Sequence, residues 1–288
     1  MNVTLPEKNK LKKKQIIIYT SIIIVCIICL ITAFYIQFYA RVNFGELLGI
    51  TEKKEFGNKT EDEIETLKTD FNKIFNNNIT NDEGNNNNNK KTDENQKLVY
   101  TQYEKKETKA NNYDLEIHIP HINIKSEIVD KYNKEIEDVF VNKAKNVMQS
   151  ENKNIIYTVE YVADVQDDIL SVMIRSNLKE GSNAQRVIIQ TYNYDLRNNK
   201  EINLEEVLKI KNIDKSELQN RIKNEIEIEQ RKVEDLEKLG YNVYSRDSTN
   251  DMYKIEQSKE FYLTDDTLYI VYAYGNENFT SEMDLIIL

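Results

Sequence analysis

The sequence has few of the residues that mark several familiar classes of protein. Its 288 residues include only two prolines, seven glycines, two histidines and two cysteines, and no tryptophan. The scarcity of proline and glycine excludes a collagen-like or other Pro/Gly-rich chain. A net charge of -10 argues against nucleic acid as the main partner, because phosphate binding requires a basic surface. Beyond residue 40 there is no cysteine, so that part must fold without disulfides.

One long uncharged segment runs from residue 15 to residue 40, and 16–36 is almost continuously apolar. A helix of about 20 residues crosses a hydrocarbon core of about 30 Å, so we predict a transmembrane helix here. The alternative is a cleaved signal peptide, but the apolar run is too long and no A-x-A-like site follows it. Cys26 and Cys29 have C-x-x-C spacing within this segment, where hydrocarbon favours neither a thiolate nor a hydrated metal.

The charges that flank this segment predict its orientation. Five lysines precede it within residues 1–14, whereas Arg41 alone follows it closely. The positive-inside rule then places residues 1–14 in the cytoplasm as a short stub and everything after residue 40 outside the cell membrane.

Residues 41–110 have the composition of a flexible stalk. They include an asparagine-rich tract between residues 76 and 89, which has too little apolar surface to offset the entropy of ordering. A short amphipathic helix is also indicated there by Ile64, Leu67, Phe71 and Ile74 at helical spacing.

Residues 111–288 carry 22 basic and 34 acidic side chains, a net charge of -12, and alternate between two hydrophobic periods. Period-two patterns predict strands at about 113–119, 155–161, 169–178, 184–194, 261–264, 268–274 and 283–287. Helical patterns cover 128–147 and 214–240. We therefore predict an α+β domain with a largely antiparallel sheet and two packed helices, preceded by a single transmembrane helix and a disordered linker.

Three segments of this domain are similar to a known pair of extracytoplasmic domains. These are Asp168–Val172, Tyr192–Glu205 and Phe261–Ile270. The pair occurs in RsiV-type lysozyme-sensing anti-sigma factors and in the non-catalytic part of PdaC-type peptidoglycan deacetylases. The resemblance implies a lysozyme-like protein or a cell-wall glycan as the partner.

The sequence departs from this pattern in three places. The loop at residues 179–185 lacks the family's Gly-Gly-Ala-His stretch, and 272–276 lacks its proline. In the lysozyme sensors these loops lie near the partner-binding surface, so the resemblance assigns ligand binding to Glu180, Ser182 and Asn183. A stub of 14 residues is also too short for the folded cytoplasmic segment that holds a sigma factor.

Candidate catalytic and metal-binding groups are few. His118 and His121 form an H-x-x-H pair, but a catalytic zinc site usually has three protein ligands. The pairs Asp167-Asp168 and Asp265-Asp266 are typical of turns rather than of a glycosidase acid and base. We therefore expect no catalytic residue, no metal and no cofactor.

Tyrosines cluster in the last strands, at Tyr262, Tyr269, Tyr272 and Tyr274. Tyr272 and Tyr274 share one face of a strand, and Tyr262 from the neighbouring strand could join them. They could cover one face of the sheet or, because tyrosine is favoured at binding surfaces, bind a ligand there together with the 179–185 loop.

These observations predict a non-enzymatic, single-pass membrane protein that displays a binding or sensing domain outside the cell. Its ligand would be lysozyme, peptidoglycan or a related wall-associated or extracellular molecule. One alternative is an anti-sigma-type signalling protein regulated by proteolysis, and another is a peptidoglycan-modifying hydrolase.

Overall fold

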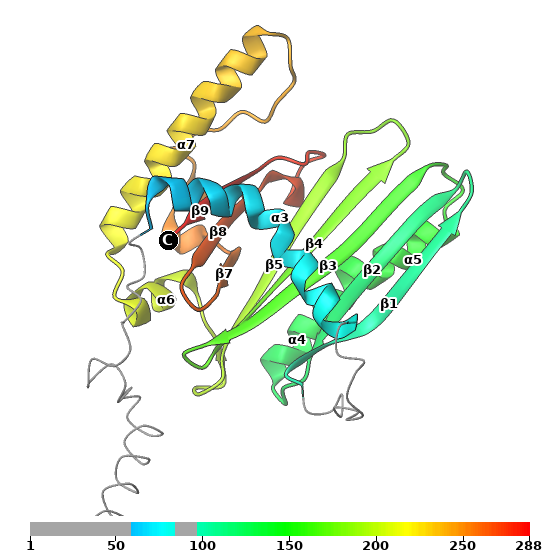
Figure 1. Ribbon diagram of the computed structural model, residues 1–288, viewed down its shortest axis with the longest axis horizontal. Helices are drawn as coiled ribbons and strands as arrows, with labels where there is room; N and C mark the ends of the chain where they lie inside the picture. The colour runs from blue at the N-terminus through cyan, green and yellow to red at the C-terminus, as the bar shows by residue number, and fades with distance from the viewer. Residues whose placement is uncertain (1–58, 84–96) are drawn as a thin grey trace, which may run out of the picture. The chain divides into compact units, whose positions relative to one another are not determined.

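The computed structural model describes residues 59–83 and 97–288. The predicted stub, the transmembrane segment and residues 84–89 of the asparagine tract lie outside these residues, whereas residues 76–83 of that tract are helical and not a disordered linker. Within the described ranges, no helix is both long enough and apolar enough to span a membrane. The described chain is a mixed α+β structure dominated by antiparallel strands (Figure 1).

Six strands form the larger sheet in the order β1-β2-β3-β4-β5-β6. They are β1 (Val99–Lys109), β2 (Tyr113–Ile122), β3 (Ile155–Gln166), β4 (Ile169–Glu180), β5 (Arg186–Asp195) and β6 (Lys200–Glu201). All neighbours are antiparallel except β2 and β3, which are parallel. A parallel pair needs a crossover connection, and here a helix supplies it.

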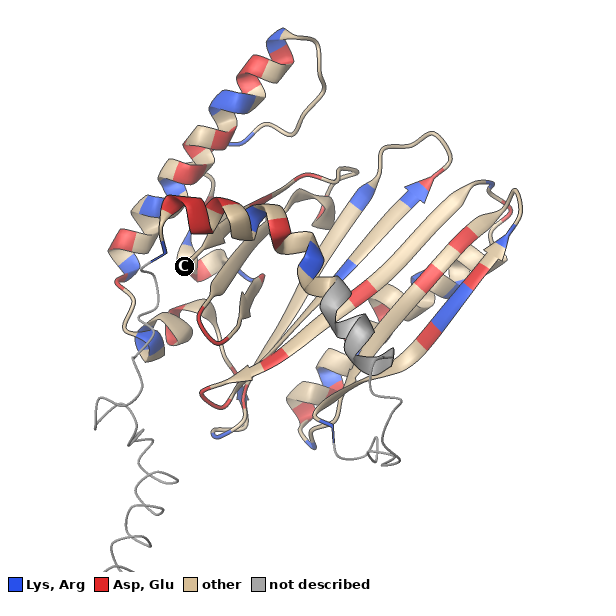
Figure 2. Cartoon of the chain, in the orientation of Figure 1, with Lys and Arg blue, Asp and Glu red and all other residues tan. Residues whose placement is uncertain are grey.

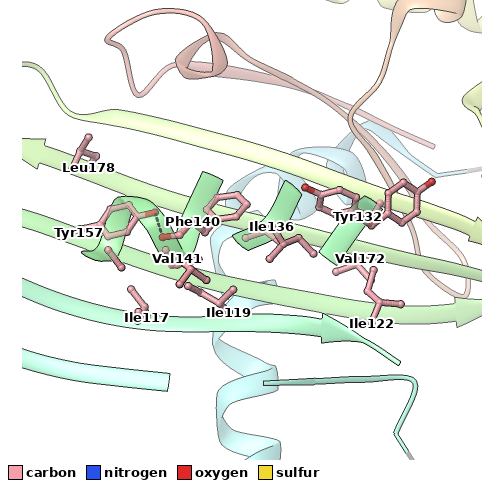
Figure 3. Packing of buried hydrophobic residues seen from close by; sticks show 14 of the residues in the cluster. Ile117, Ile119, Ile122, Tyr132, Ile136, Phe140, Val141, Tyr157, Val172 and Leu178 are labelled. Carbon is pink, nitrogen blue, oxygen red and sulfur yellow. Dashed lines mark hydrogen bonds between the residues drawn. The ribbon is translucent and has the colours of Figure 1, made fainter. Parts of the chain in front are cut away.

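That crossover is one continuous helix in three parts. They are α4 (Glu127–Ile136), a π-helical turn η2 (Glu137–Val141) and α5 (Asn142–Gln149). The Ser126 side chain caps the first turn by accepting a hydrogen bond from the Ile128 N–H. The predicted apolar stripe is confirmed, since Tyr132, Ile136 and Phe140 pack on the sheet (Figure 3).

A second, three-stranded antiparallel sheet lies against the other face of the first. It consists of β7 (Phe261–Leu263), β8 (Leu268–Ala273) and β9 (Met283–Ile287). On its outer side pack α6 (Leu204–Lys211) and α7 (Lys215–Lys238). The second sheet therefore has no solvent-exposed face, and three 3-10 turns complete the fold: η3 (Asp251–Tyr253), η4 (Ile255–Gln257) and η5 (Tyr274–Asn276).

A buried polar joint fastens the two sheets together. The Ser171 hydroxyl is hydrogen-bonded to the Asn193 side-chain oxygen and accepts the Leu263 N–H at 3.1 Å. The Asn193 amide in turn donates to the Phe261 carbonyl at 3.0 Å. The strand β7 is thus tied to the start of β4 and the end of β5 by side chains rather than by a shared ladder.

The aspartate pair between β3 and β4 is a turn, as interpreted from the sequence. Asp167 and Asp168 have φ angles of 51° and 63°, which a two-residue hairpin turn of type I′ requires. Their carboxylates pair with Lys211 at 2.7 Å and Arg197 at 2.9 Å. Both acids therefore have structural partners on neighbouring segments.

The folded part begins well before residue 111, which corrects the predicted extent of the stalk. The strand β1 pairs along most of β2, so the expected boundary falls inside a hairpin. The amphipathic helix is confirmed as α3 (Glu61–Glu83), which starts with a capping box between Thr60 and Glu63. It is not free, because its apolar face is buried on the domain.

The contacts of α3 are made mainly by two phenylalanines. Phe71 and Phe75 are 2% and 0% exposed and pack with Val162, Met173 and the second sheet. The Arg175 guanidinium lies 4.3 Å from the centre of the Phe75 ring. Such burial opposes the entropy that a flexible stalk would retain.

Candidate functional site

The predicted tyrosine surface is buried in the structure. Tyr262, Tyr272 and Tyr274 are 3%, 4% and 2% exposed. Tyr272 and Tyr274 face α6 and α7, whereas Tyr262 packs with Tyr269 against the first sheet, so the three do not share one surface. The Tyr272 hydroxyl is hydrogen-bonded to Ser258 at 2.9 Å. The three side chains are packed in the interior, and ligand binding by them stays a prediction.

Tyr274 belongs to a buried hydrogen-bond network, although it and Tyr272 also line a separate cavity of about 280 Å³. Its hydroxyl lies 2.8 Å from that of Tyr253 and donates to Asp284. The Asp284 carboxylate accepts two hydrogen bonds from Arg246, at 2.7 and 3.0 Å. A buried ion pair is tolerated only when such additional hydrogen bonds satisfy it, and this one holds the segment after α7 against β9.

The predicted loop residues lie at the β4–β5 turn. Ser182 and Asn183 are exposed there. Glu180, at the end of β4, pairs with Lys143 of α5 at 3.1 Å and lines a groove beside β5. Only Glu180 of the six predicted site residues is part of that groove.

We use the name β5 groove for two adjoining cavities of about 600 and 390 Å³ between the crossover helix and the segment before β7. Glu135, Gln190, Lys259 and Glu260 line both cavities, which makes the two continuous. The combined volume falls in the range typical of small-ligand sites.

Simple periodicity places the lining side chains. Glu135, Val139 and Lys143 follow one another at four-residue steps on the helix, so they share its groove-facing edge. On β4 the lining residues are Ser176, Leu178 and Glu180, and on β5 they are Arg186, Ile188 and Gln190. Alternate residues of a strand point to the same face, which explains both sets.

The outer edge of β5 is closed by polar groups from the C-terminal half. The Asn276 side chain accepts the Ile189 N–H at 3.0 Å and donates to the Ile189 carbonyl at 2.8 Å. Glu260 accepts the Thr191 N–H at 2.6 Å, and the Thr280 carbonyl accepts that of Val187 at 3.0 Å. These contacts fix the wall of the groove.

Glu260 is the groove residue with the most perturbed carboxyl. Burial raises its pKa to about 7, opposed by the hydrogen bonds from Thr191 and reinforced by the nearby Glu135 carboxylate. At the same end of the groove, the rings of Tyr132 and Tyr192 lie 5.0 Å apart. The groove thus combines carboxylates, aromatic faces and amides.

The two histidines of the H-x-x-H pair have different surroundings. The described residues contain no group of three or more His, Cys, Asp or Glu side chains placed to hold a metal ion. His118 Nδ1 lies 4.0 Å from a Glu104 oxygen, and His121 packs beside Tyr100 with its pKa lowered by burial.

No family model matches the sequence, and no curated protein matches it either. Two of its structural neighbours are proteins of the DUF3298 family, a family of unknown function. One, from Pseudomonas aeruginosa, is 12% identical with a TM-score of 0.37 and covers 66% of this chain and 87% of its own. Another, from Bacteroides fragilis, is 17% identical with a TM-score of 0.34 and covers 61% and 81%.

Proposed function

We propose that this chain is a single-pass membrane protein with its N-terminus in the cytoplasm and a binding domain outside the cell. The domain would bind a wall-associated or extracellular ligand, such as a lysozyme-like protein or peptidoglycan, rather than catalyse a reaction. The observation that carries the proposal is the β5 groove, a sizeable polar and aromatic hollow whose walls are held by hydrogen bonds. The resemblance to RsiV-type and PdaC-type ectodomains supports it.

Binding can be tested by filling the groove. Gln190 lines both cavities, so Gln190→Trp places a large side chain inside it. Gln102→Trp, at an exposed position of β1 outside the groove lining and outside the 179–185 loop, is the matched control. We expect the detergent-solubilised full chain to bind lysozyme or soluble peptidoglycan fragments in calorimetric titrations, and only Gln190→Trp to abolish binding. Equal binding by both variants would show that the ligand does not bind in the β5 groove.

The membrane anchor is tested separately. The full chain should sediment with membranes and should lose its C-terminal domain to protease added to intact protoplasts. Deletion of residues 15–40 should release the domain to the soluble fraction. Protection of the domain in intact protoplasts would contradict the proposed orientation.

The docking of α3 favours the signalling alternative as a second candidate. This helix connects the N-terminal region to the domain and is held by Phe71, by Phe75 and by an ion pair of 2.9 Å between Lys68 and Glu225 of α7. A ligand that loosens these contacts would expose the connecting segment to proteolysis. Limited proteolysis with and without lysozyme tests this idea, and an unchanged cleavage pattern in the presence of bound lysozyme would exclude it.

A further inference from the structure

The β5 groove cannot bind a ligand by adding a strand to the sheet. Strand addition needs free N–H and C=O groups along an edge, and the outward N–H groups of β5 and its Ile189 carbonyl already have partners. The N–H groups of Val187, Ile189 and Thr191 donate to Thr280, Asn276 and Glu260. A ligand in this groove must therefore be recognised through side chains, and the charges of the lining become decisive.

The charged lining residues fall into those with partners and those without. Glu180 pairs with Lys143, and Arg186 donates to the carbonyls of Gly275 and Asn276. Among the described residues, Glu135, Glu260 and Glu277 make no ion pair. The excess of carboxylates over available cations gives the groove a negative character that a cationic ligand would complement.

The aromatic residues of the groove fit the same chemistry. Tyr132 and Tyr192 line the part of the groove that also contains Glu135 and Glu260. An ammonium or guanidinium group is attracted to a tyrosine ring as well as to a carboxylate. Aromatic rings next to carboxylates without counter-ions are therefore suited to a long cationic side chain.

We propose that the β5 groove binds a lysine or arginine side chain of a basic protein or peptide, with its cationic group at the carboxylates of Glu135 and Glu260. This inference rests on the proposed binding function and adds the chemical class of the ligand. The methylene stem of such a side chain would pass the small exposed parts of Tyr132 and Tyr192, which are 8% and 5% exposed, and its charge would add to that of Lys259 beside the two carboxylates.

The same arrangement makes binding dependent on pH. Burial raises the pKa of Glu260 to about 7, so this side chain loses its proton as the pH is raised through that value. The groove then gains a carboxylate beside Glu135, and its affinity for a cation rises. The charged groups around Glu260 in the groove are Glu135 on α4, Lys143 on α5, Glu180 on β4, Arg186 on β5, Glu201 on β6, Glu256 and Lys259 before β7, and Glu277 after η5. Of the nearby charges, Glu135 favours the protonated form of Glu260 and Lys259 favours the ionised form.

The test uses the full chain in detergent with a hexalysine peptide, and with the same peptide acetylated on every lysine. Variants Glu135→Gln and Glu260→Gln remove one charge each without changing shape. Glu237→Gln, on the exposed end of α7, removes the same charge outside the groove. We expect each groove variant to weaken hexalysine binding by about tenfold, the usual effect of losing one charge-assisted hydrogen bond, and the control to leave it unchanged. The acetylated peptide should not bind.

The pH dependence gives an independent readout. The unmodified chain should bind hexalysine more tightly at about pH 8.5 than at about pH 5.5, and Glu260→Gln should remove most of this difference. Equal weakening by Glu237→Gln, or full binding of the acetylated peptide, would overturn the inference. Peptidoglycan binding that is lost in Gln190→Trp but unchanged in both charge variants would overturn it too, yet would leave the proposed binding function intact. Failure of hexalysine, lysozyme and peptidoglycan alike to bind would reject both.

Discussion

At the residue scale, Glu260 is held where ionisation is unfavourable. Its pKa rises from an ordinary 4.5 to about 7, so the folded state binds more protons than the unfolded state between these values. Stability therefore falls as the pH rises through this window. Glu260→Gln keeps an oxygen that can accept the Thr191 N–H and has no charge to bury.

We expect Glu260→Gln to raise the free energy of unfolding by about 2–3 kcal/mol near pH 8 and to change it little near pH 4. Urea titrations at several pH values measure this difference. A variant that is less stable than the parent near pH 8 would show that the carboxylate is solvated or paired in the folded protein.

Gly275 is required for a close approach between two segments. A Cβ atom at this position would lie 1.8 Å from the Val187 carbonyl oxygen, which no real contact allows. The backbone must then move, and with it the Asn276 side chain that covers the edge of β5. We expect Gly275→Ala to cost at least about 3 kcal/mol, in the range of severe overpacking.

Gly240 provides the matched control. It has a φ angle of +89° but no atom within 4 Å of an added Cβ, so Gly240→Ala tests backbone strain alone. Its cost should stay near about 1 kcal/mol. Thermal unfolding of the two variants under the same conditions measures this difference. Equal decreases in the midpoint temperature of both variants would contradict the steric explanation.

At the scale of elements, α3 depends on two side chains for its attachment. Phe71 and Phe75 supply most of its buried apolar surface, and their rings are 5.8 Å apart. Truncation of a buried phenylalanine to alanine costs about 3–5 kcal/mol. We expect Phe71→Ala to free α3 while the sheets stay folded, seen as fast amide exchange in residues 61–75. Lys73→Ala, on the exposed side of the helix, should leave exchange slow.

The sequence predicted the elements with clear periodicity but not the edges of the fold. The strand β1 reads VYTQYEKKETK, and its charges suit an exposed edge strand, where they oppose pairing with other chains (Figure 2). Because of the same charges, its sequence was assigned to the flexible stalk and not to a strand. In the strand β8 the difficulty is different, because all six of its residues are buried. A strand without apolar–polar alternation gives no indication of which of its faces meets solvent.

The groove was not predicted because it is assembled from distant positions. Glu135, Gln190 and Glu260 lie on a helix, a strand and a connection, and nothing in their local sequence joins them. One usable signal was present, since Glu260 directly precedes the buried strand Phe261–Leu263. A carboxylate at the entrance to a buried strand is a candidate for a raised pKa.

At the scale of the whole described domain, Asn193 connects three layers. It lies on β5, donates to the Phe261 carbonyl of the second sheet, and its own carbonyl accepts the Tyr132 hydroxyl of α4 at 3.3 Å. Its side chain also holds Ser171, which accepts the Leu263 N–H. A joint of this kind should make the two sheets unfold together.

Asn193→Ala would leave the buried Ser171 hydroxyl and Phe261 carbonyl without this partner, at a cost of about 2–4 kcal/mol. Asn177→Ala, which removes a half-buried hydrogen bond of 2.9 Å to Thr158 on the first sheet alone, should cost about 1 kcal/mol.

Urea unfolding followed both by far-UV circular dichroism and by tyrosine absorbance should give coincident transitions in the parent chain. Most of the tyrosines near the second sheet are buried, so an earlier loss of their signal would report separate melting of that sheet. If the joint couples the layers, Asn193→Ala should separate the two transitions and Asn177→Ala should leave them coincident; coincident transitions in Asn193→Ala would show that other contacts couple the sheets.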